Sequence, residues 1–205
     1  KSAAKIAEYF EHLIATGKVG VTSLCLGMNR LNSEGAGIIV KSLREYKFLT
    51  RLLLDANRIH RDGLEIILNC LENHPGLTLL DLGMYKSTPD MGELPNNFRE
   101  CGDLISKFLA NSSILKGFDV SHSHLTEQDL TTISQSIPKQ LLYCNTLQYG
   151  LKNPVAKQAW KEIERKLKLN ISAENKSYQE VQNNFRFHKH TTEISLIDSI
   201  YRNNM

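Results

Sequence analysis

A few residues of this chain have the side chains that enzymes and metal sites use. Cys25 could act as a nucleophile beside a histidine, and the runs Ser121–His124 and His188–His190 carry histidines that could bind a metal. Neither run has a matching set of cysteines or carboxylates at ligand spacing, so we expect no metal site. Gly35 and Gly37 are not followed by the Lys-Ser/Thr pair of a phosphate-binding loop, and we expect no cofactor.

The elements that would position these residues are copies of one short motif. The segment VTSLCLGMNRL, residues 21–31, has apolar residues at its positions 1, 4, 6 and 11 and asparagine at position 9, which is the template of a leucine-rich repeat. LTRLLLDANRI, from residue 49, is a second good copy. LTLLDLGMYKS, from residue 77, and LKGFDVSHSHL, from residue 115, are weaker copies in which Tyr85 and Ser123 replace the asparagine.

The spacing of the copies gives the period. Residues at position 4 are 28 apart from Leu24 to Leu52 and from Leu52 to Leu80, and 38 apart from Leu80 to Phe118. A fainter fifth copy would place Leu147 at position 4 and a tyrosine at position 6. In each unit the alternating LxxLxL part predicts a short strand, and the following residues predict a helix.

The longer spacing in the third repeat indicates an insertion of ten residues within segment 86–98. Its apolar residues are Met91, Leu94 and Phe98. Insertions in repeat arrays map to loops on one face, often the binding face. The alternative is that these three residues fill a gap in the core.

The period of 28 residues with a full helix in every unit resembles the ribonuclease-inhibitor-like group of leucine-rich-repeat proteins, over roughly residues 19–167. This resemblance implies an α/β solenoid shaped like a horseshoe, with parallel strands on the concave face, helices on the convex face, and a concave surface that grips another protein. The bias toward Lys, Asn, Ile and Ser, with degenerate repeats, also resembles the leucine-rich-repeat proteins that intracellular bacteria secrete into host cells.

We therefore divide the chain into an N-terminal helix over residues 1–17, which is a cap or part of a trimmed repeat, about five repeats over residues 18–169, and a C-terminal cap or tail over residues 170–205. In this frame three strand spacings, about 14 Å at about 4.8 Å each, separate Cys25 from His122. Proton transfer needs hydrogen-bond reach, so we expect no enzyme.

Alternation along the strands predicts which side chains face the concave surface. If positions 4 and 6 point into the core, positions 3, 5 and 7 point outward, and the adjoining turn adds its own residues. The predicted protein-binding residues are Ser23, Cys25, Met28, Arg30, Arg51, Leu53, Asp55, Arg58, Leu79, Asp81, Met84, Tyr85, Asp119, Ser121 and His122. An apolar centre with a charged rim is typical of a protein-binding surface, although these positions could also be merely solvated.

Composition limits the partners. The net charge of +3 gives no reason to expect nucleic acid or an anionic membrane, and no apolar run approaches the roughly 18 residues of a membrane span. The four cysteines have no close spacing, which favours reduced thiols in the cytoplasm. The bacterial resemblance adds a host-cell cytosol as an alternative location.

We predict a non-catalytic module, monomeric on its own, that binds a folded protein partner on its concave face and rim loops and inhibits or regulates that partner. The alternative is a substrate-targeting domain of a larger enzyme or secreted effector.

Overall fold

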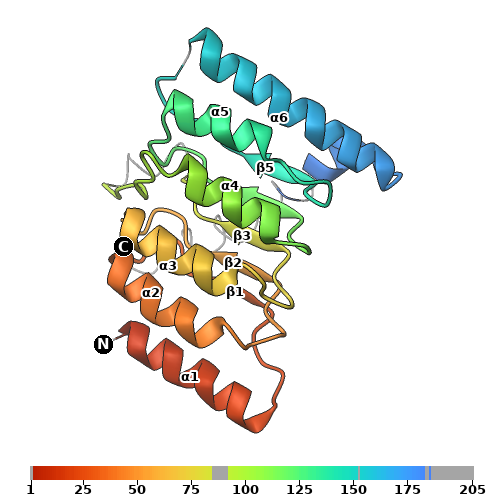
Figure 1. The fold of residues 1–205 in the computed structure, drawn as a ribbon. Coiled ribbons are helices and arrows are strands. Elements are labelled where there is room, and N and C mark those ends of the chain that lie inside the picture. Colours follow the sequence, from red (N-terminus) through yellow and green to blue (C-terminus); the bar gives the residue numbers. More distant parts are fainter. Residues whose placement is uncertain (1, 85–91, 152, 183–184, 186–205) are drawn as a thin grey trace, which may run out of the picture.

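The computed structural model describes residues 2–84, 92–151, 153–182 and 185 as an array of alternating strands and helices (Figure 1). After helix α1 (Ser2–Thr16), each strand is followed by a helix. The strands are β1 (Ser23–Cys25), β2 (Arg51–Leu53), β3 (Leu79–Asp81), β4 (Gly117–Asp119) and β5 (Tyr143–Asn145). The other helices are α2 (Asn32–Leu43), α3 (Arg61–Leu71), α4 (Gly102–Asn111), α5 (Glu127–Gln135) and α6 (Pro154–Ala173).

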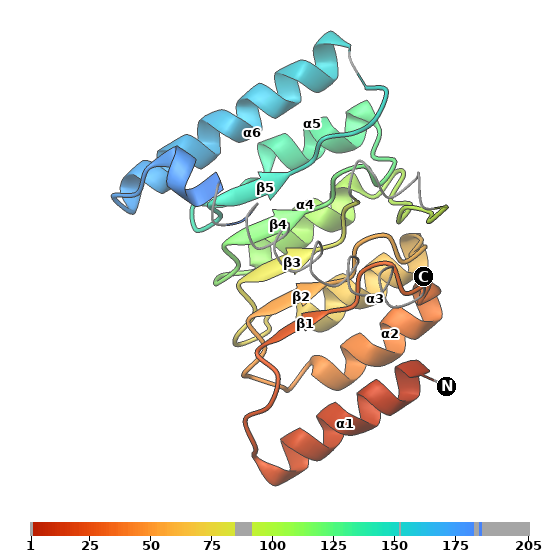
Figure 2. The same ribbon diagram turned by 180° about the vertical axis from the view of Figure 1, so that it is seen from behind.

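The five strands form one parallel sheet in sequence order. The register aligns the predicted repeats, with Leu24 beside Leu52, Leu52 beside Leu80, and Leu80 beside Phe118. Parallel neighbours need a crossover between them, and here every crossover contains a helix. The helices lie on one side of the sheet, which faces the viewer in Figure 1. The opposite side of the sheet, with its strands in front of the helices, is seen in Figure 2.

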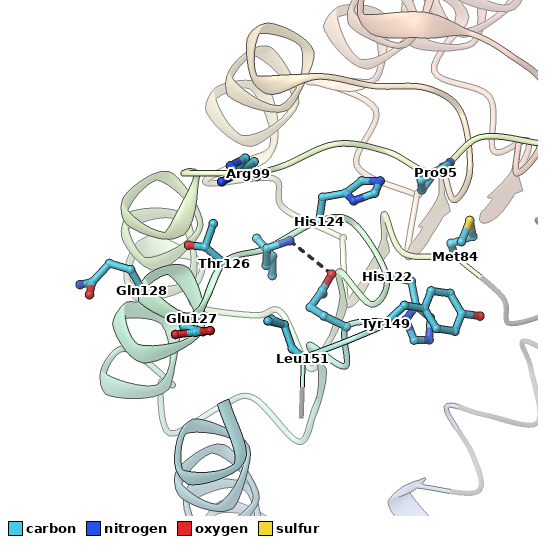
Figure 3. A pocket seen from close by; sticks show the side chains of 12 residues that line it. Met84, Pro95, Arg99, His122, His124, Thr126, Glu127, Gln128, Tyr149 and Leu151 are labelled. Carbon is cyan, nitrogen blue, oxygen red and sulfur yellow. Dashed lines mark hydrogen bonds between the residues drawn. The ribbon is translucent and has the colours of Figure 1, made fainter. Parts of the chain in front are cut away.

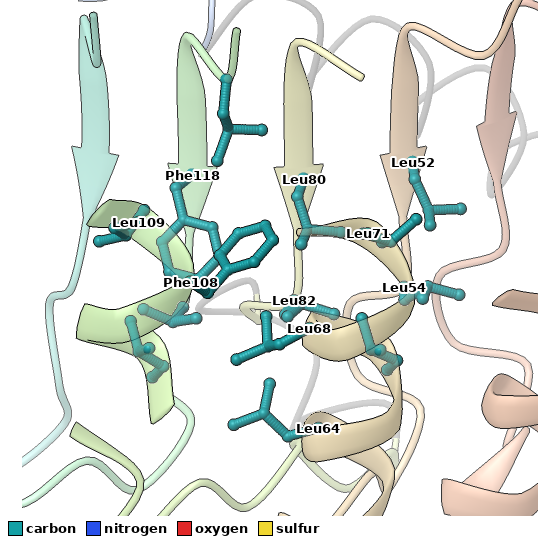
Figure 4. Close-up of a cluster of buried hydrophobic side chains, with 14 of the residues drawn as sticks. Leu52, Leu54, Leu64, Leu68, Leu71, Leu80, Leu82, Phe108, Leu109 and Phe118 are labelled. Carbon is teal, nitrogen blue, oxygen red and sulfur yellow. The ribbon is translucent and has the colours of Figure 1, made fainter. Parts of the chain in front are cut away.

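The core lies between the sheet and the helices (Figure 4). Side chains at positions 4 and 6 of the second, third and fourth repeats are 0% exposed, and they pack on helical residues such as Leu64 and Phe108. The residues at positions 4 and 6 are Leu52, Leu54, Leu80, Leu82, Phe118 and Val120. Each repeat thus buries its apolar face against its neighbours, as expected of a solenoid.

The register corrects the sequence prediction for the fifth repeat. Cys144, rather than Leu147, pairs with Phe118, so position 4 falls three residues earlier than predicted. Leu147 and Tyr149 are consequently 50% and 46% exposed instead of buried. Phe118 and Cys144 are 26 residues apart, so the fourth repeat is shorter than its predecessors, and the search for a leucine near the usual spacing selected Leu147.

The insertion in the third repeat resolves into two parts. Residues 85–91, with Met91, lie outside the described residues. Leu94 is 57% exposed, whereas Phe98 is 0% exposed and belongs to the core. Phe98 therefore fills the core, as the second alternative predicted, while the binding role of the insertion stays a prediction.

The predicted boundaries of the terminal helix, the repeats and the C-terminal segment stay predictions. In the described part of the chain, no helix is both long and apolar enough to cross a membrane.

Candidate protein-binding surface

Buried amides shape the turns at the carboxyl ends of the strands. Asn57 accepts hydrogen bonds from the backbone N–H groups of Asn29 (3.1 Å) and Leu31 (3.2 Å), and its own amide donates to the Leu26 carbonyl (2.7 Å). Asn57 is at position 9 of its repeat, and an asparagine amide can fill this role because it both donates and accepts hydrogen bonds. The turns of successive repeats are thereby tied to one another.

In the third repeat this role belongs to Asn96 rather than to the residue at position 85. Asn96 accepts from the N–H groups of Asn57 (3.0 Å) and Ile59 (2.9 Å) and donates to the carbonyls of Leu54 (3.1 Å) and Leu82 (2.8 Å). The inserted residues therefore lie before Asn96, and the last positions of the motif, beginning with this asparagine, follow the insertion. Tyr85 itself lies outside the described residues.

The last described turn uses a glutamine. Gln148 accepts from the N–H of Leu125 (3.2 Å) and donates to the carbonyl of Val120 (3.0 Å). In the fourth repeat, the Ser123 hydroxyl donates to the Val120 carbonyl of its own turn. The N–H of Phe98, from the preceding repeat, donates to the backbone carbonyl of Ser123 and not to its side chain. The short serine side chain does not span two turns here.

Glu93 joins the insertion to the first two repeats. Its carboxylate accepts from Arg30 Nε at 2.9 Å and lies 3.5 Å from an Arg58 guanidinium nitrogen. The hydrogen bond from Arg30 lowers the pKa of the Glu93 carboxyl. The Arg30 side chain is 60% exposed, so solvent screens this pair and its main effect is to hold the end of the insertion in place.

A cleft of about 570 Å³ opens at the same edge of the sheet (Figure 3). Its lining comes from the end of the insertion and from the turns after β4 and β5, and it includes Pro95, His124 and Leu151. The His122 ring stacks on the ring of Tyr149, with centroids 3.6 Å apart and planes 13° apart. Leu94, Leu147 and Tyr149, all around half exposed, belong to the same insertion and turns.

We call this edge the rim surface and define it by six residues of the turns and the insertion. These residues are Arg30, Arg58, Glu93, Leu94, His122 and Tyr149.

The protein-binding residues predicted from strand alternation, which we call the concave strip, are half buried and half accessible. Of its described members, Ser23, Cys25 and Arg30 are exposed, and Met28, Arg51, Arg58 and His122 are half-buried. Seven others are buried, which contradicts the expectation of an open strip: Leu53, Asp55, Leu79, Asp81, Met84, Asp119 and Ser121. Alternation correctly separates these residues from the core side, but it carries no information about what lies over them.

The acids of the strip are structural where their contacts are described. Asp119, 1% exposed, accepts from the Ser121 hydroxyl (2.7 Å), the Tyr143 hydroxyl (3.2 Å) and the Asn145 amide (3.1 Å). Asp81 accepts from the N–H of Gly83 at 3.0 Å. These carboxylates orient neighbouring strands and turns.

The described residues offer little to covalent or metal chemistry. Burial raises the pKa of the thiols of Cys70, Cys101 and Cys144, which keeps them protonated and poorly nucleophilic at neutral pH. Two strands, β2 and β3, lie between β1, which carries Cys25, and β4, which precedes His122. In this part of the chain no three His, Cys, Asp or Glu side chains gather as metal ligands, and the run His188–His190 lies outside it.

Two solved structures superimpose on nearly their whole length. One is a tropomodulin C-terminal domain from Caenorhabditis elegans, with a TM-score of 0.60 and 12% identity over 82% of this chain and 95% of that domain. The other is actin-binding site 2 of leiomodin-1, with a TM-score of 0.64 and 13% identity over 87% of this chain and 96% of that one. The chain is a leucine-rich-repeat solenoid.

These comparisons confirm the predicted α/β solenoid and correct the predicted family. No protein-family model and no curated protein sequence matches the chain. The resemblances to the ribonuclease-inhibitor-like group and to secreted bacterial effectors are wrong, because the solved structures that share the fold are the tropomodulin and leiomodin-1 domains. A repeat period reflects the size of the unit, which unrelated solenoids can share.

Sequence reasoning missed several residues of the rim surface and its cleft. Glu93 carries no signal in the sequence, because its partners come from repeats more than thirty positions away. Tyr149 was assigned to the core through the misplaced fifth repeat. Gln148 lies one residue before position 9 of the corrected fifth repeat, so its amide could be found only once the register of that repeat was known.

Proposed function

We propose that this chain is a non-catalytic recognition module that binds a folded protein, and that actin is that protein. The observation that carries the proposal is the rim surface, where an open cleft lies beside exposed apolar side chains of the insertion and of the turn after β5. Exposed apolar patches with a polar border mark protein interaction sites. The likeness to a leiomodin-1 actin-binding site supports the choice of partner through the fold alone.

The exposed and half-buried members of the predicted strip extend the proposed surface. Ser23, Cys25, Met28 and Arg51 lie on β1, β2 and the turn after β1, next to Arg30 and Arg58 of the rim surface. A partner seated on the rim surface would therefore also meet the concave side of the first two strands. The suggestion that this chain targets substrates for a larger enzyme stays a prediction.

Replacing Leu94 with Asp is expected to weaken the binding of monomeric actin by more than about tenfold, because a central apolar contact would become a desolvated charge. The matched control is Leu169→Asp on α6, since Leu169 is 59% exposed and Leu94 is 57% exposed. Fluorescence anisotropy of labelled chain titrated with actin measures both dissociation constants. Equal losses for the two variants, or none for Leu94→Asp, would contradict the rim surface, and no binding by the unmodified chain would contradict actin.

A further inference from the structure

A notch in the concave face holds an aromatic ring. Position 3 of successive strands is Leu79, Gly117 and Tyr143, which are register partners. Gly117 has no side chain, so its backbone forms the floor between the two larger residues. A Cβ atom there would lie 2.5 Å from Cε1 of Phe185 and 2.8 Å from Cδ1 of Leu79, which shows that the Phe185 ring packs directly on this backbone.

Hydrogen bonds, as well as the contact with Phe185, hold the wall of the notch in place. Tyr143 is 5% exposed and stacks on Phe185, with ring centroids 5.1 Å apart and planes 16° apart. The Tyr143 hydroxyl donates to Asp119, which is itself fixed by Ser121 and Asn145. A pre-organised aromatic wall lowers the entropic cost of binding a second ring.

The chain turns back after α6 (Figure 2), and Phe185 lies against Gly117 of β4. Glu174 pairs with Lys116 at 2.7 Å, and a helical turn over residues 178–182 follows. Val181 of that turn is 3% exposed and packs with Leu142 and Ile171. Phe185 also packs against this cluster, but it is only half-buried, so part of its ring stays accessible while its edge lies on Gly117.

We propose that the notch formed by Leu79, Gly117 and Tyr143 is a binding site for an aromatic side chain of a partner's peptide segment, and that Phe185 occupies it in the free chain. Aromatic side chains that fill pre-formed pockets are frequent hot spots of protein interfaces. Because Phe185 belongs to the same chain, it competes for the notch at an effective concentration in the millimolar range. Weakly binding ligands would therefore not displace it, whereas a tightly binding ligand would. This site is separate from the rim surface and does not depend on actin as the partner.

A peptide in trans tests the proposal. A fluorescent peptide with the sequence of residues 181–189, VQNNFRFHK, is titrated with the full chain and with its Phe185→Ala variant. We expect saturable binding to the variant, with a dissociation constant below about 1 mM, and binding at least about tenfold weaker to the unmodified chain. The same peptide carrying alanine in place of its first phenylalanine should lose this binding.

A second variant separates a binding notch from a structural contact. Phe185→Ala combined with Gly117→Ala places a methyl group on the floor of the notch, and this double variant should bind the peptide at least about tenfold more weakly than Phe185→Ala alone. Circular dichroism establishes that each variant is folded. Equal peptide binding by the unmodified chain and Phe185→Ala, no binding to Phe185→Ala, or undiminished binding by the double variant would each overturn the proposal.

Discussion

Replacing Asn96 with alanine is expected to lower the free energy of unfolding by about 3–5 kcal/mol, because it leaves buried backbone groups of the second and third repeats without partners. Asn96 is 0% exposed and makes four hydrogen bonds, two to N–H groups of the second repeat and one each to the carbonyls of Leu54 and Leu82. Alanine removes all four, and the enclosed site limits their replacement by water.

Asn97 provides a control one residue away. It is exposed, and its side chain accepts only a 3.3 Å bond from the N–H of Arg99. Asn97→Ala should therefore change the free energy of unfolding by no more than about 0.5 kcal/mol. Urea denaturation followed by circular dichroism and by the fluorescence of Trp160, the single tryptophan, gives both values. Similar losses for the two variants would show that the amide of Asn96 does not stabilise the turns.

Replacing Phe118 with alanine is expected to lower the free energy of unfolding by about 3–5 kcal/mol, because the substitution leaves a cavity at the centre of the core. Phe118 is 0% exposed, occupies position 4 of β4, and lies with its ring centroid 5.9 Å from that of Phe108 on α4 (Figure 4). It replaces the leucine of earlier repeats, so the packing between β4 and α4 depends on its larger volume.

Tyr149→Ala is the matching control for Phe118→Ala. Tyr149 was assigned to the core from sequence but is 46% exposed, so its removal should lower the midpoint of denaturation much less. The same urea titrations compare the two. A loss for Tyr149→Ala as large as that for Phe118→Ala would contradict the register of the fifth repeat.

The repeats could be predicted because their signal is local. Leu52 and Leu54, or Leu80 and Leu82, alternate over a few residues and recur at a fixed period, and this is sufficient to define strand, core side and helix. Asn96 could not be predicted in the same way, because the insertion places it eleven residues beyond position 9 of the contiguous motif. A template that requires contiguous positions placed Tyr85 at position 9, although the asparagine and the core residue Phe98 follow the insertion in their usual order.

The binding surface was harder to predict because burial on the concave side depends on distant parts of the chain. Alternation places Leu79 and Gly117 on that side, but only the structure shows Phe185 packed on Gly117, after a chain reversal beyond α6. Leu53 and Asp81 were natural choices as exposed central contacts, yet they are 7% and 3% exposed. Charged replacements there are therefore expected to affect stability, and they would be poor tests of binding.

Amide hydrogen exchange of the chain, with and without saturating monomeric actin, tests most directly whether the rim surface is the binding site. Peptides covering residues 92–95 and 146–151 should exchange more slowly in the complex, because the partner would cover Leu94, Tyr149 and the cleft between them. Peptides from the exposed sides of α2 and α3 should exchange at unchanged rates. Protection confined to those helices, or no protection anywhere at saturation, would contradict the proposal that the rim surface binds actin.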